Sequence, residues 1–196
     1  MFRRGFKTWS EQTALRVRQK LKVSSISPLD PFGLAELLGV FVLQPEGLVD
    51  LPEEVRSRLV NAHRDCWSAI TVSDGNCHLI VTNSSHAKTR VNSSLAHELA
   101  HIILGHEPSM MFMSPRSGMA LRTYNEEQEE EANWLAGCLL LPREALVAIR
   151  RRGLSDEDAG PEYGVSSAMM RFRFNVTGVD AQLRHRGGQR WRKSVQ

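Results

Sequence analysis

The stretch from Leu95 to Leu104 constrains this chain most, because it is an apolar helix that carries two histidines and a glutamate. The motif His97-Glu98-x-x-His101 has leucine, alanine and isoleucine on both sides, and Gly105 is placed to end the helix. Apolar residues on both sides of the motif predict a buried helix. Two neutral imidazoles and a carboxylate are costly to bury unless a partner satisfies them. We therefore expect a metal ion to bind here.

The spacing of the motif selects both the ion and the chemistry. His97 and His101 are four residues apart, so they project from one helix face about 6 Å apart along the axis. Both imidazoles can then reach one Zn²⁺ ion at about 2.0–2.1 Å. Glu98 lies one residue further round the helix, where its carboxylate can reach water at the metal without being a ligand. This pattern is typical of zinc peptidases in which the glutamate is the general base.

A catalytic zinc site needs a third protein ligand, and the same helix is one possible source. His106 or Glu107 could turn back towards the ion. The metzincin pattern, however, requires glycine at position 104 and histidine at position 107, and this chain has Leu104 and Glu107 there. We therefore expect the third ligand to come from another helix.

The second possible source is a helix that begins with acidic residues near position 126 and ends before Pro142. Most of its glutamates suit a solvated first turn that interacts favourably with the helix dipole. Glu129 differs, because it shares a face with small residues that allow close helix packing and with Asn133, which could support a ligating histidine. We expect Glu129 to be the ligand. The alternatives on the same helix are Glu126, Glu130 and Glu131.

The remaining segments predict an α+β fold. Residues 10–22 and 31–38 have helical patterns, and Asn92, Ser93 and Ser94 are candidate N-caps for the motif helix. Residues 40–43 are expected to form a strand, and residues 67–72 and 78–82 flank a turn with Asp74-Gly75 that indicates a hairpin. We expect a mostly helical zincin-like core with a small three-stranded antiparallel sheet.

The C-terminal part has a helix, a turn at Gly164 and a second helix, with the spacing of a helix-turn-helix. As a DNA reader the second helix would present Met169, Arg171 and Arg173. As a packing element it would bury its other face, namely Met170, Phe172 and Phe174. The aromatic content favours packing. We expect three parts: a metallopeptidase domain over 1–141, a helix-turn-helix-like segment over 142–180 and a basic tail over 181–196.

Composition limits the cellular setting and the partners. No apolar run approaches the roughly 20 residues needed to span a bilayer, and no apolar segment of a secretory signal follows Met1. Three cysteines fit a reducing compartment, so we expect a cytoplasmic protein without a membrane partner. Residues 142–196 hold 11 of the 25 Lys and Arg residues but only six of the 22 Asp and Glu residues. DNA contact through this basic end is possible but not favoured over a solvated terminus.

Two blocks of sequence together resemble the ImmA/IrrE family of metallopeptidases. The first runs from Trp67-Ser68-Ala69-Ile70 through Leu79-Ile80-Val81-Thr82-Asn83 and Arg90 to the motif helix and Leu104-Gly105-His106. The second is Glu129-x-Glu131-Ala132-Asn133-Trp134-Leu135-Ala136, followed by Leu139-Leu140-Leu141-Pro142. The resemblance covers roughly residues 28–180. It implies a gluzincin-like zinc site with His97, His101 and Glu129 as ligands and Glu98 as base.

The resemblance also implies a substrate class. Members of the family are typically cytoplasmic and cleave or otherwise inactivate helix-turn-helix repressors of phage, mobile-element or stress genes. We therefore expect a zinc endopeptidase whose partner is such a repressor or an antitoxin. Two alternatives remain open at this point: a zinc-dependent toxin of a toxin–antitoxin pair, and a non-proteolytic regulator that binds DNA or a partner and contains a structural zinc.

Overall fold

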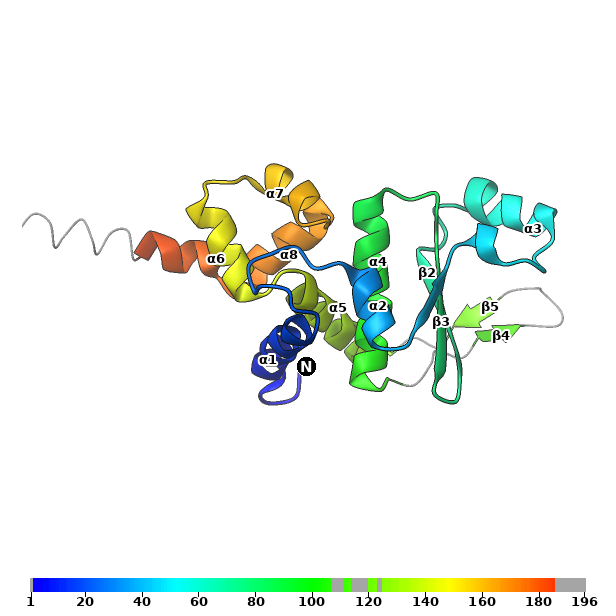
Figure 1. Ribbon diagram of the computed structural model, residues 1–196, viewed down its shortest axis with the longest axis horizontal. Helices are drawn as coiled ribbons and strands as arrows, with labels where there is room; N and C mark the ends of the chain where they lie inside the picture. The colour runs from blue at the N-terminus through cyan, green and yellow to red at the C-terminus, as the bar shows by residue number, and fades with distance from the viewer. Residues whose placement is uncertain (1, 107–110, 114–119, 123–124, 186–196) are drawn as a thin grey trace, which may run out of the picture.

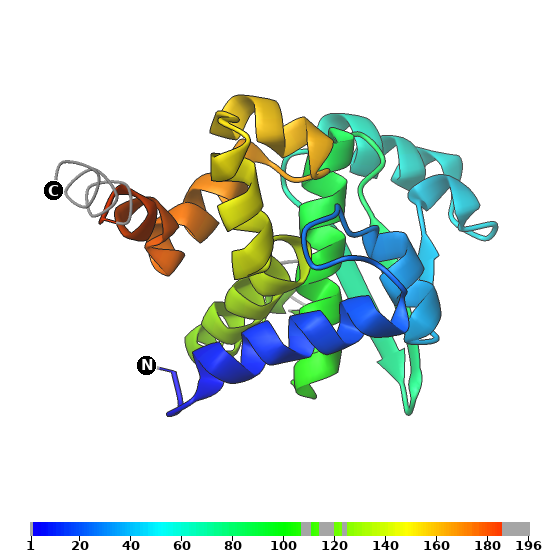
Figure 2. The same ribbon diagram turned by 60° about the vertical axis from the view of Figure 1, so that its left-hand side comes forward.

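One long helix, α4 (Lys88–Leu104), occupies the centre of the computed structural model, between a small sheet and a group of helices (Figure 1). The structure describes residues 2–106, 111–113, 120–122 and 125–185. In these ranges the protein is mostly helical with a three-stranded mixed sheet, which agrees with the α+β class expected from the sequence. The helix α1 crosses α5 on the side of α4 that is turned away from the sheet (Figure 2).

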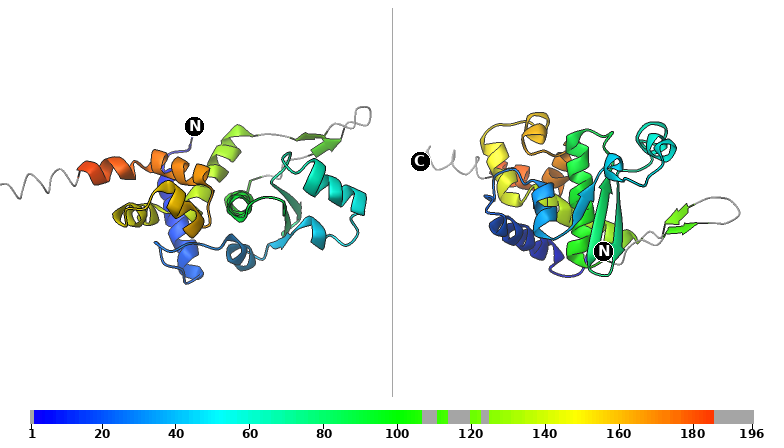
Figure 3. Two further views of the ribbon diagram at one scale, coloured as in Figure 1. Left: turned by 90° about the horizontal axis from the view of Figure 1, so that it is seen from above. Right: turned by 45° about the vertical axis from the view of Figure 1, so that its right-hand side comes forward.

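The helical elements are α1 (Phe6–Lys20), α2 (Pro31–Leu37), η1 (Pro45–Gly47), α3 (Glu53–Ser57), η2 (Arg58–Ala62), α4, α5 (Glu126–Leu140), α6 (Arg143–Arg151), α7 (Asp156–Glu162) and α8 (Ser167–Thr177). The strands are β1 (Phe41–Leu43), β2 (Ala69–Asp74), β3 (Cys77–Thr82), β4 (Met111–Met113) and β5 (Ala120–Arg122). The last two pair with each other in a separate hairpin, which lies on the same side of the molecule as α3 and projects away from α6 to α8 (Figures 1 and 3).

The three-stranded sheet has the order β1-β3-β2. The predicted hairpin is confirmed: β2 and β3 pair antiparallel, and Gly75 in the turn has a φ of 55°, which suits glycine. The prediction of an entirely antiparallel sheet is wrong, because β1 pairs parallel with β3. Residues 44–68 form a connection long enough to carry the chain over to the far edge, so β1 and β3 can run in the same direction.

The C-terminal end of α4 lies where the sequence predicted it, but the N-terminal end does not. Gly105 ends the helix as expected, with a φ of 66°. The predicted N-caps are wrong, since α4 begins at Lys88 and Asn92 lies inside it. Asn92 is buried, and its amide donates to the carbonyl of Gly164 at 3.0 Å. A polar residue that suits a cap therefore serves here to join α4 to the turn before α8.

The helix α5 lies between α4 and α1, and its last turn is held by two buried arginines. The Arg18 guanidinium donates to the carbonyls of Leu139 and Leu140, and Arg173 donates to the carbonyl of Leu141. Burial lowers the pKa of Arg18 to about 10, and the carbonyls compensate for part of the lost hydration. These contacts fix α5 at its C-terminal end, while its N-terminal half reaches the motif.

The C-terminal helices pack onto this core. Met170 and Phe174 of α8 are buried, as the packing interpretation expects, and Arg173 has no exposed surface. One of the three side chains considered for DNA reading is therefore inside the protein. The basic tail beyond residue 185 lies outside the described residues. In the part of the chain that the structure describes, no single helix is long and apolar enough to cross a membrane; α5 and α6, bent by 50°, pass that test only when joined.

Candidate metal centre

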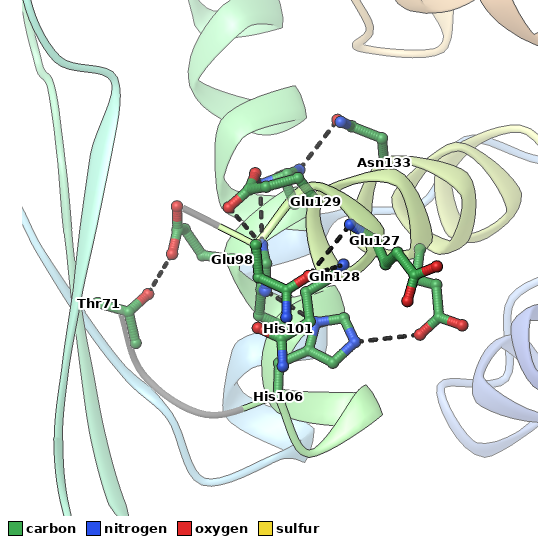
Figure 4. A network of polar contacts seen from close by, with 11 residues as sticks. Thr71, Glu98, His101, His106, Glu127, Gln128, Glu129 and Asn133 are labelled. Atoms are coloured by element: carbon green, nitrogen blue, oxygen red, sulfur yellow. Dashed lines mark hydrogen bonds and ion pairs between the residues drawn. The ribbon is translucent and has the colours of Figure 1, made fainter. Parts of the chain in front are cut away.

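Two neighbouring helices bring three metal-ligating side chains together. His97 and His101 belong to α4, and Glu129 belongs to the first turn of α5. Figure 4 shows His101 and Glu129 side by side. The two Nε2 atoms lie 3.1 Å apart. Glu129 Oε2 lies 3.1 Å from Nε2 of His97, and Oε1 lies 3.6 Å from Nε2 of His101. One candidate ligand atom from each residue lies within 4.8 Å of the other two.

These separations fit a zinc ion. Two ligand atoms bound at about 2.0–2.1 Å to one tetrahedral zinc lie roughly 3.3 Å apart. Nε2 of His97 lies 3.1 Å from both Nε2 of His101 and Oε2 of Glu129, close to that value, and one ligand atom from each of the three residues lies within 4.8 Å of the other two. The donor set of two imidazoles and one carboxylate also suits zinc better than calcium or magnesium, which prefer oxygen ligands only. The three side chains are largely screened from solvent, with exposed fractions of 16–20%.

Asn133 supports the first histidine, as its place on the face of Glu129 predicted. Its Oδ1 lies 3.0 Å from Nδ1 of His97. A carbonyl oxygen can only accept, so Nδ1 of His97 is the donor and carries the proton. In the neutral ring Nε2 then has a free lone pair directed at Glu129 and His101. The hydrogen bond therefore selects the tautomer that can bind a metal.

Glu98 lies on the face of α4 that is turned towards β2, close to His101 (Figure 4). It is buried, with 7% of its surface exposed, and its Oε2 accepts from the hydroxyl of Thr71 at 2.5 Å. Sequence reasoning did not find Thr71, which is 27 residues away and belongs to a strand with simple alternation of inward and outward side chains. This contact places the expected general base beside the edge strand β2.

The other acidic candidates lie elsewhere. Among the described residues, the only group of three that fits a metal is His97, His101 and Glu129, without Glu126, Glu130 or Glu131. Glu131 instead faces His106, which is outside the group. His106 contacts Nδ1 of His101, the ring nitrogen that is not directed at the other two candidate ligands. Glu107, the remaining alternative, lies outside the described residues.

A hollow of about 530 Å³ adjoins the centre through Asn133. Its walls are mainly apolar and come from the N-terminus, α5 and α8: Phe2, Glu130, Asn133, Trp134, Ser166, Ala168, Met169 and Phe172. A larger hollow of about 710 Å³ lies between α1 and α6, and its lining includes none of the three candidate ligands. The first hollow could hold an apolar side chain next to the metal centre.

Residues 60–175, more than half of the chain, match the family model described as the IrrE N-terminal-like domain, Peptidase_M78. The chain belongs to this family. It is therefore a metallopeptidase of the ImmA/IrrE family, as the sequence resemblance indicated. The match includes both helices of the candidate centre. No curated protein and no solved structure gave a significant match.

Proposed function

We propose that this ImmA/IrrE-family protein is a zinc-dependent endopeptidase, with His97, His101 and Glu129 as zinc ligands and Glu98 as general base. The observation that carries the proposal is the convergence of one ligand atom from each of the three residues to within 4.8 Å of one another. Family membership supports zinc, because this peptidase family is generally zinc-dependent. Three protein ligands leave a fourth position open, as catalytic zinc sites require.

When bound, zinc would lower the pKa of a water molecule and polarise a peptide carbonyl. The chain's own part in proton transfer falls to Glu98. Thr71 holds one of its carboxylate oxygens, Oε2, so the second oxygen, Oε1, is the atom that takes the proton from water. Glu98 then delivers this proton to the leaving amine. The burial of Glu98 limits exchange of the proton with bulk solvent.

We propose that the substrate binds as an extended segment along β2. This strand forms one edge of the sheet β1-β3-β2, and within the described residues no strand pairs with its outer side. An edge strand offers backbone donors and acceptors to a peptide. Because Thr71 of β2 contacts Glu98, a peptide on this edge would pass close to the general base.

We also propose a zincin-like core built from the sheet, α4 and α5, and a helix-turn-helix-like arrangement of α7 and α8 that packs onto this core. The division after residue 141 stays a prediction. Buried residues from Phe6 to Val179 form one continuous hydrophobic core. The C-terminal helices therefore share the core that positions the metal centre.

The substrate we propose is a helix-turn-helix repressor, cleaved in the cytoplasm. The proposal rests on the family to which the chain belongs. To test it, a candidate repressor encoded next to this gene is co-expressed with the wild type or with Glu98→Gln. We expect the wild type to cleave the repressor, and Glu98→Gln to retain zinc but to leave the repressor intact. Cleavage by Glu98→Gln at the wild-type rate would show that Glu98 is not the base.

A further inference from the structure

The second histidine of the motif has a partner of its own on the side away from the metal centre. Nδ1 of His101 lies 2.9 Å from Nδ1 of His106, and Nε2 of His106 lies 3.3 Å from Oε2 of Glu131. The side chain of His106 is only 7% exposed. His101 of α4, His106 just after the end of α4 and Glu131 of α5 therefore form one continuous hydrogen-bonded chain that ends at the metal centre.

The local sequence explains how His106 reaches His101. Gly105 adopts a φ of 66°, and its N–H donates to the carbonyl of Ile102, while the N–H of His106 donates to the carbonyl of His101. This pair of bonds is a Schellman motif, in which the second residue after the helix contacts the residue five positions earlier. That contact is usually hydrophobic. Here it joins two imidazoles, whose ring centroids are 5.0 Å apart at an interplanar angle of 68°.

The direction of each hydrogen bond follows from the chemistry of its end. An ionised carboxylate can only accept, so Nε2 of His106 donates to Glu131. Nδ1 of a neutral His106 is then the acceptor, and Nδ1 of His101 must be the donor. With its proton on Nδ1, His101 presents the lone pair of Nε2 to His97 and Glu129. The chain thus selects the same metal-binding tautomer in His101 that Asn133 selects in His97.

We propose that His106 and Glu131 form a positioning dyad that orients His101 and strengthens it as a zinc ligand. Their action passes through His101, so neither is a catalytic residue or a ligand. The two ligand histidines then have different support: a neutral amide behind His97 and an imidazole–carboxylate pair behind His101. A carboxylate at the end of such a chain makes the ligand imidazole more basic, so that it donates its lone pair more strongly to the metal. Loss of this support typically weakens metal binding 10–100-fold. The inference rests on the proposed zinc site.

The first test measures the dissociation constant of zinc by competition with a chromophoric chelator. His106→Phe keeps a ring of similar shape but cannot accept from His101, so we expect the constant to rise about 10–100-fold. Glu131→Gln removes the charge at the end of the chain and should cause a smaller rise. In His106→Gln the amide can still accept from His101 and donate to Glu131, so binding should recover towards that of the wild type.

Glu130→Gln is the matched control, because Glu130 and Glu131 are neighbours that line the same hollow of about 430 Å³ with His106. It changes the charge by the same amount outside the dyad, and we expect wild-type affinity. If Glu130→Gln weakens zinc binding as much as Glu131→Gln, the effect comes from the loss of any negative charge near the site, and the dyad is refuted. Equal affinity of His106→Phe and the wild type refutes it as well.

The second test separates positioning from mere structural support. At saturating Co²⁺, the visible absorption bands report the ligand field at the metal independently of affinity. We expect these bands to shift in His106→Phe and Glu131→Gln, and to remain unchanged in Glu130→Gln. Unshifted bands in both dyad variants contradict the proposal. If the wild type binds neither Zn²⁺ nor Co²⁺, the zinc peptidase proposal fails together with the dyad. If the wild type binds both ions and the dyad variants do not differ from it, the dyad alone fails.

Discussion

Replacing Gly137 by alanine tests how closely α8 must approach α5, because two opposing effects decide the sign. Alanine in place of glycine inside a helix normally stabilises a protein by about 1 kcal/mol. A Cβ at position 137, however, would lie 2.5 Å from Cδ of Arg173, which is completely buried. Relief of this contact requires Arg173 to move by about 1 Å, away from the carbonyl of Leu141 and the carboxylate of Glu11.

We expect the steric effect to outweigh the helix propensity. Overpacking a core costs about 1–3 kcal/mol, and weakening a hydrogen bond to a charged group costs about 1.5–3 kcal/mol. After subtraction of the helix gain, the free energy of unfolding should fall by about 1.5–5 kcal/mol. This corresponds to a loss of roughly 3–20 °C in the unfolding midpoint for a chain of this size. Urea unfolding followed by circular dichroism measures the change.

Gly33→Ala in α2 is the matched control. Gly33 is also helical, and the nearest atom to its added Cβ, Oδ2 of Asp30, is 3.9 Å away. Without a clash only the propensity remains, so this variant should gain about 1 kcal/mol. The reasoning is refuted if Gly137→Ala is as stable as the wild type or more stable, since α8 would then not be held at this distance.

Two further predictions use the thiols and the support of the general base. Cys138 is buried and burial raises its pKa to about 12, so at pH 8 it should resist alkylation while the exposed Cys66 and Cys77 react, as mass spectrometry can show; rapid labelling of Cys138 in the folded protein contradicts its position. Thr71→Val should leave the zinc content unchanged but slow cleavage of an identified substrate about 10–150-fold, because a hydrogen bond to a charged group is worth about 1.5–3 kcal/mol. Ser73→Ala on the same strand is its control, and equal rates for both variants would show that Thr71 does not support Glu98.

Local patterns were sufficient to predict from the sequence that the three candidate ligands lie together. The four-residue spacing of His97 and His101 fixes their common face on any helix, and Glu129 was identified from the small residues and Asn133 on its own face. The Schellman contact of His106 was also readable in principle, because Gly105 follows the motif helix directly. The sequence by itself presents His106 only as a possible ligand, because its contact with Glu131 depends on the packing of α5 against α4.

Features that depend on contacts between distant segments could not be predicted from the sequence. The parallel pairing of β1 with β3 depends on the path of residues 44–68, and the contact between Thr71 and Glu98 joins residues 27 positions apart. Asn92 suits a helix cap by its chemistry, but its amide is used to bind Gly164, 72 positions away. In each case a contact made in the folded protein overrides the local preference.

The most direct test of the metal centre is the zinc stoichiometry of the wild type, Glu129→Gln and Glu130→Gln by equilibrium dialysis. If two imidazoles and the Glu129 carboxylate hold the ion, the wild type and Glu130→Gln will each bind one zinc ion per chain, and Glu129→Gln will lose most of it at the same free concentration. Undiminished zinc in Glu129→Gln, or none in the wild type, contradicts this assignment.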